Sequence, residues 1–204
     1  SSLTLFAKRN VDRVIGGWEM GAATTQFFNP AYILLFGSIF SIMWIKLSKI
    51  GKNPIIPLKF GLGIIQLGLG YLVVYLGSMF VSDAYLVPLW TLCFLYLLHT
   101  TGELFLSPIG LSMVTKLAPA HLTGTAMGGW FLSFAASNYV AAILAKATGQ
   151  GGHGSAEVSE AAGAAESLAT YVDVYTTMGL ITVGIGVFLC LISKPLNRMM
   201  HGVV

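Results

Sequence analysis

Five long apolar stretches, each able to cross a membrane as one helix, set the strongest limit on how this chain can fold. A helix needs about 20 apolar residues to cross a bilayer. The stretches do not alternate apolar and polar residues, which disfavours a membrane β-barrel. Because every backbone group in a bilayer core must be hydrogen-bonded within the protein, we expect helices. The predicted spans cover residues 16–47, 57–80, 87–115, 121–146 and 168–193.

The beginning of the first span is open to two interpretations. On the narrow one the helix runs from Gln26 to Leu47, and the pair Asn29–Pro30 is an ordinary helix start. On the broad one a tilted helix begins at Gly16, which puts Asn29 inside the membrane, where its amide needs hydrogen-bond partners. Residues 1–7 form an apolar stub that is too short to cross a bilayer.

The charge content agrees with a membrane protein and excludes other classes. Of 204 residues only 9% are charged, whereas a soluble domain carries about a quarter. Disordered chains are richer in charge, and two cysteines are too few for a disulfide scaffold. The run at 149–154 matches G-x-G-x-x-G, but a membrane span precedes it where a dinucleotide site needs a strand. We therefore expect no enzyme activity, no metal, no cofactor and no nucleic-acid partner.

The distribution of Lys and Arg predicts the orientation in the membrane. Cytoplasmic connections carry an excess of these residues. The richer set of alternate connections holds Lys46, Lys49, Lys52, Lys59, Lys116, Lys194 and Arg198, and the poorer set holds Lys8, Arg9, Arg13 and Lys146. The C-terminus is therefore expected to be cytoplasmic. The Gly-, Ala- and Ser-rich segment 147–167 is expected to be a flexible outer loop.

Glu103 is the acid that lies deepest in a predicted span, in the run LLHTTGELFLSPIG. A central acid costs about 2.5 to 3.5 kcal/mol even on lenient insertion scales, so it should face a cavity or a partner, or be protonated. It could bind a cation or exchange a proton; a structural hydrogen bond to a neighbouring helix is the alternative. His99 and Ser107 lie one turn away on either side. His99 could relay a proton or simply join two helices.

Trp130 lies about ten residues into its span, too deep for an interfacial anchor. It could fill the protein core or form the wall of a substrate cavity. Small residues predict close helix contacts in two spans. They are Gly61, Gly63, Gly68 and Gly70 in the second span and the pair Gly124 and Gly128 in the fourth.

Three segments resemble the proton-dependent oligopeptide transporter family of the major facilitator superfamily. They are GELFLSPIGLSMVTKLAP at 102–119, FFNPAYILLF at 27–36 and GTAMGGWFLS at 124–133. The resemblance implies an all-α membrane protein, with residues 1–204 forming the C-terminal six-helix bundle of a transporter and residue 1 lying within the first helix of that bundle. The N-terminal bundle would then be a missing partner, and the fragment would be inactive alone.

The same resemblance implies the roles of individual residues. Glu103 would hold the amino terminus of a peptide, and Asn29 and Ser107 would line the pocket. Trp130 would form a pocket wall or a gate. Glu103 and His99 are the candidates for coupling to protons, the coupling ion. His99, however, matches no family pattern.

The function expected from this resemblance is import of di- and tripeptides with protons by alternating access, in the lipid bilayer of a bacterial inner membrane. Two alternatives stay open. One is a facilitator-type transporter for another solute, such as nitrate or a drug. The other is a non-transporting scaffold subunit, which would have Glu103 tied up in a hydrogen-bond cluster.

Overall fold

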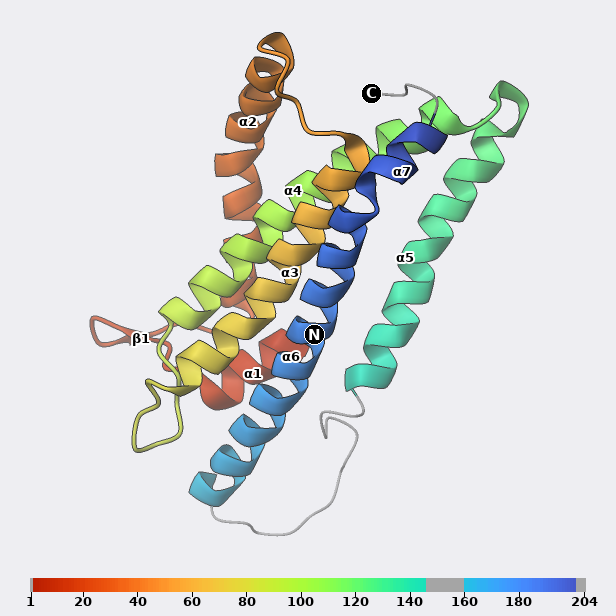
Figure 1. Ribbon diagram of the computed structural model, residues 1–204. Helices are drawn as coiled ribbons and strands as arrows, with labels where there is room; N and C mark the ends of the chain where they lie inside the picture. Colours follow the sequence, from red (N-terminus) through yellow and green to blue (C-terminus); the bar gives the residue numbers. More distant parts are fainter. Residues whose placement is uncertain (1, 146–159, 201–204) are drawn as a thin grey trace.

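The computed structural model describes residues 2–145 and 160–200, which form helices joined by short connections (Figure 1). The long helices are α2 (Phe28–Lys49), α3 (Ile56–Ser78), α4 (Trp90–Leu117), α5 (Thr123–Ala145) and α6 (Glu160–Leu191). The shorter elements are α1 (Ser2–Asn10), the hairpin strands β1 (Val14–Ile15) and β2 (Trp18–Glu19), the 3-10 turns η1 (Thr24–Phe27) and η2 (Ala120–Leu122), and α7 (Ser193–Met199). The all-α prediction is confirmed.

Four helical segments of the described chain are long and apolar enough to cross a membrane. They are Thr24–Lys49, Ile56–Ser78, Trp90–Leu117 and Gly163–Leu191. Helix α5 covers nearly all of the fourth predicted span, 121–146, whose last residue, Lys146, lies outside the described residues. That span stays a prediction.

The broad beginning of the first span, at Gly16, is wrong. Gly16 and Gly17 have φ values of 58° and 87° and form the tip of an antiparallel hairpin in which Val14 pairs with Glu19. Two consecutive positive φ angles suit the tight turn of such a hairpin, and glycine adopts them without steric cost. Arg13 and Glu19 brace its base with an ion pair of 2.6 Å. Helix α2 then begins at Phe28, so Asn29–Pro30 is a helix start, as the narrow interpretation has it.

Two further boundaries differ from those predicted. Helix α4 begins at Trp90 rather than Val87, because the Val87 N–H donates to Asn10 O (2.8 Å) and Val87 O accepts from Asp12 N (2.9 Å). These bonds hold Val87 beside the segment after α1.

The predicted loop 147–167 is wrong at its end, since α6 begins at Glu160. The alanine-rich run after Glu160 favours helix. The rest of that loop, to residue 159, lies outside the described residues.

Helix α3 is the centre of the bundle. It packs most extensively on α6 along one side and on α4 along the other, and α2 packs on the outer side of α4. Helix α5 has its main contacts with α4 and stands apart from α3 and α6 (Figure 1). Helix α4 therefore touches α2, α3 and α5, and any site shared by these helices is built on it.

Two rows of glycines in α3 allow these close contacts, as the sequence predicted. A Cβ added at Gly68 would lie 2.8 Å from Gly179 O of α6, and one added at Gly61 would lie 3.0 Å from Gly186 O. The second row faces α4: Gly63 lies against Gly102, Gly70 against His99 and Gly77 against Thr91. Each row repeats every seven residues, or about two helical turns, so each keeps to one side of the helix.

Replacing Gly68 by alanine is expected to lower the thermal stability of the protein. The new methyl group would meet backbone atoms, Gly179 O and Val183 N, both at 2.8 Å, so α3 and α6 would have to separate. Overpacking of this kind costs about 1–3 kcal/mol. The Gly37→Ala variant is the matched control, because nothing lies within 4 Å of a Cβ there. Thermal unfolding in detergent measures both; equal melting temperatures would contradict the close packing.

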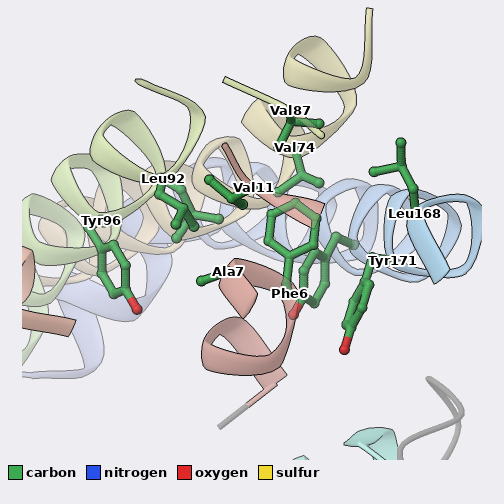
Figure 2. Packing of buried hydrophobic residues seen from close by; sticks show 11 residues of the cluster. Phe6, Ala7, Val11, Val74, Val87, Leu92, Tyr96, Leu168 and Tyr171 are labelled. Carbon is green, nitrogen blue, oxygen red and sulfur yellow. The ribbon is translucent and has the colours of Figure 1, made fainter. Parts of the chain in front are cut away.

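A buried cluster joins the ends of α1, α3, α4 and α6 nearest the hairpin (Figure 2). Phe6 of α1 packs edge-on against Tyr171 of α6, with ring centroids 5.2 Å apart. The fully buried Asn10 side chain donates to Ala164 O and accepts from Ser167 Oγ, both at 2.8 Å. These contacts hold the short helix α1 firmly against α6.

Candidate functional site

The candidate site is built along one face of α4, at Thr100, Glu103, Ser107 and Gly110. We call these four positions the α4 row. Their spacings of three and four residues place them along one side of a helix. The row covers about 15 Å at 1.5 Å per residue. Asn29 of α2 reaches its first position, and Trp130 of α5 reaches its last.

Glu103 stands exposed in the middle of the row, within a membrane-crossing helix. In the described part of the chain, its carboxylate has neither a hydrogen-bond nor an ion-pair partner. Ser107, one turn further, is half-buried, and its hydroxyl has no hydrogen bond to any described residue. A free carboxylate in a span needs a partner from outside these helices, because an unpaired charge there is costly.

Asn29 and Thr100 join α2 to α4. Thr100 is fully buried, and its Oγ1 donates a hydrogen bond of 3.2 Å to Asn29 Oδ1. Asn29 lies in the first turn of α2, where Pro30 also fits because the N–H groups of a first turn have no helical acceptor. The contact brings an amide to within one turn of Glu103.

Asn29 also lines a hollow of about 550 Å³ between α1, α2 and α4. Its other lining residues are Leu3, Gln26, Phe27, Pro30 and Tyr96. The walls combine apolar and aromatic surface with two amide side chains, and the Gln26 amide donates to Thr4 of α1. A mostly apolar wall with few polar groups is typical of a small-molecule site.

Trp130 lies against the last position of the row. A Cβ added at Gly110 would lie 2.3 Å from Trp130 Cη2 and 2.7 Å from Cζ2, so the indole fits because residue 110 is glycine. The ring also packs edge-on with Phe134, 6.1 Å away. Close packing at Gly124 and Gly128 was predicted and is wrong for the described chain, since nothing lies within 4 Å of a Cβ at either position. The contact of α5 with α4 depends on Gly110 instead.

His99 lies between α3 and α4 rather than beside Glu103. Its Nε2 is 3.1 Å from Leu67 O of α3, and its ring packs edge-on against Tyr71 with centroids 4.6 Å apart. It also fills the space left by Gly70. These contacts favour the interpretation of His99 as a residue that joins two helices.

The structure adds two positions to those predicted from the sequence. Thr100 donates a hydrogen bond to Asn29, and Gly110 leaves the space that the Trp130 ring occupies. The sequence signal that could have identified both positions was their spacing from Glu103 and Ser107 along one helix face. Within residues 2–145 and 160–200 no group of three His, Cys, Asp or Glu side chains could hold a metal ion.

The arrangement is that of a multi-pass helical membrane protein, with polar groups along one face of a membrane-crossing helix. A solved structure of peptide transporter POT in complex with sulfate matches 98% of this chain with a TM-score of 0.75 and 29% identity, over 36% of its own length. The family model of the POT family matches residues 1–158. The chain belongs to the POT family, whose fold is that of the major facilitator superfamily.

Two relatives show the extent of the similarity. The uncharacterized transporter YclF of Bacillus subtilis is 34% identical over 99% of this chain and 37% of its own length. The dipeptide and tripeptide permease A of Edwardsiella piscicida is 34% identical over 99% of this chain and 39% of its own length. The chain thus spans less than half the length of the relatives that it matches.

Proposed function

We propose that this chain is part of a proton-coupled symporter for di- and tripeptides and supplies one wall of the peptide site. The observation that carries the proposal is the Glu103 carboxylate on a membrane-crossing helix, with which no described residue pairs. Glu103 pairs with the ammonium group of the peptide and takes part in proton coupling, with Asn29 and Ser107 beside it and Trp130 closing one end. The rest of the same protein supplies the opposite wall, and the two parts rock about the site near the bilayer midplane.

The size of the site supports a short peptide as substrate. An extended tripeptide spans about 10 Å, at 3.3–3.6 Å per residue. Along α4, Glu103 lies about 10 Å from Gly110, at 1.5 Å per residue, so an extended tripeptide whose ammonium group is held at Glu103 can reach the Trp130 end. A single amino acid would not reach it.

The lack of a hydrogen-bond partner for Glu103 among residues 2–145 and 160–200 also weighs against a scaffold subunit, in which Glu103 would belong to a hydrogen-bond cluster. A transporter for nitrate is disfavoured by charge, because a carboxylate repels an anion. We further propose that the protein lies in a bacterial inner membrane with the C-terminus in the cytoplasm, as the distribution of Lys and Arg predicts.

Competition for uptake tests the peptide assignment. The full-length transporter that carries this chain is reconstituted into liposomes with an inward proton gradient, and uptake of labelled dialanine is measured. We expect unlabelled di- and tripeptides to compete, whereas free alanine and a tetrapeptide do not. Accumulation should collapse when a protonophore removes the gradient. Uptake that peptides do not inhibit, or that survives the protonophore, would contradict the proposal.

A further inference from the structure

We propose that Thr100 is a positioning residue, which turns the amide nitrogen of Asn29 toward the hollow so that it donates a hydrogen bond to an acceptor oxygen of the ligand. In a peptide this acceptor is the carbonyl oxygen of the peptide bond. The inference rests on the proposed function, because it concerns how the same site recognises a peptide.

The two neighbouring threonines of α4 differ in how they use their hydroxyl groups. Thr101 Oγ1 donates within its own helix, to Leu97 O at 2.8 Å and Leu98 O at 3.2 Å. Thr100 Oγ1 donates across to α2 instead, to Asn29 Oδ1. Buried hydroxyls are almost always hydrogen-bonded, and Thr100 is completely buried. The Thr100 hydroxyl therefore holds the oxygen end of the Asn29 amide against α4.

Holding the oxygen end leaves the nitrogen end for a ligand. The oxygen and nitrogen of a planar amide point in different directions, so an oxygen turned to α4 turns the nitrogen away from it. Nothing in the described residues accepts a hydrogen bond from Asn29 Nδ2. Asn29 forms part of the wall of the hollow, so an amide nitrogen turned away from Thr100 can donate to a ligand there.

The site then offers complementary groups at neighbouring positions, because Asn29 contacts Thr100, which precedes Glu103 by three residues on α4. The Glu103 carboxylate accepts from an ammonium group, and the Asn29 amide donates to a carbonyl oxygen. The amino nitrogen and the first carbonyl oxygen of a peptide belong to the same residue, so an acceptor and a donor at neighbouring positions suit the amino-terminal residue. A ligand that carries only a cation would leave the Asn29 donor unpaired, which reduces its affinity.

The test compares dialanine with its thioxo analogue, in which sulfur, a weak acceptor, replaces the oxygen of the peptide carbonyl. Each is used to inhibit uptake of labelled dialanine by the full-length transporter in proteoliposomes. We expect dialanine to bind the wild type about three- to tenfold more tightly than the analogue, the usual effect of one hydrogen bond. Thr100→Val keeps the side-chain shape without the hydroxyl, and the ratio should fall to about one, mostly through weaker binding of dialanine.

Two other variants show whether the effect comes from the hydroxyl at this position. Thr100→Ser retains a hydroxyl and should restore the preference for dialanine. Thr101→Val removes the neighbouring hydroxyl, which bonds only within α4, and should leave the ratio at the wild-type value. Loss of the preference in Thr100→Val, with the preference present in these two variants, supports the inference.

Each remaining outcome overturns the inference in a distinguishable way. If Thr100→Val weakens both ligands equally, Thr100 is only structural. If the wild type binds both peptides equally, the peptide assignment holds, but Asn29 does not donate a hydrogen bond to the peptide carbonyl. If dialanine does not inhibit uptake at all, the proposed function fails and the inference fails with it.

Discussion

Replacing Glu103 by glutamine is expected to abolish proton-driven uptake of dipeptides by the full-length transporter. Glutamine keeps the size of the side chain and one acceptor oxygen, but it loses the negative charge and the site for a proton. A hydrogen bond to a charged group contributes about 1.5–3 kcal/mol, so peptide affinity should fall by about 10- to 100-fold. Since no described residue pairs with Glu103, no other partner is left uncompensated and the fold should be unaffected.

Uptake of labelled dialanine into proteoliposomes under an imposed pH gradient measures the first effect, and thermal unfolding in detergent measures the second. The matched control is Glu166→Gln, the same substitution at an exposed position near the start of α6. That variant should transport at the wild-type rate. Wild-type uptake by Glu103→Gln would remove the main support for a peptide site on α4.

The helices could be predicted from the sequence because each is a long apolar stretch, and in a membrane such a stretch must be helical. The hairpin was missed on the broad interpretation because Gly16, Gly17 and Trp18 are uncharged and extend the apolar stretch that follows. The adjacent glycines at 16 and 17 were the signal for a turn. The start of α6 was missed because Gly, Ala and Ser suggest a flexible loop, although the alanines favour helix.

The candidate site was only partly predictable. Glu103 is visible in a sequence because an acid in a span is costly wherever it points. The contact between Asn29 and Thr100 joins residues 71 positions apart, and it depends on how α2 packs against α4. His99 shares a helix face with Glu103 by spacing alone, yet the glycine at position 70 gives it room against α3. Such contacts follow from the packing of helices, which one sequence does not reveal.

Replacing Gly110 by alanine is expected to displace Trp130 and to lower peptide uptake by about tenfold, as a misplaced group in a binding site typically does. The added methyl group would lie 2.3 Å from the Trp130 ring and 3.1 Å from Phe60 Cζ. Phe60 limits the room on the other side, so the indole must swing out or α5 must move away from α4. Because α5 has its main contacts with α4, either change alters the wall of the site.

The Gly128→Ala variant is the control, since it adds the same methyl group on α5 where nothing lies within 4 Å. Alanine is the better helix former, so this variant should be neutral or slightly more stable. A double-mutant cycle then identifies the cause of the effect at Gly110. If the methyl group acts through the indole, the added cost of Gly110→Ala should largely disappear in a Trp130→Ala background, because residues in contact are not additive. Equal losses in both backgrounds would show that Gly110 acts through the α4 backbone and that Trp130 does not depend on it.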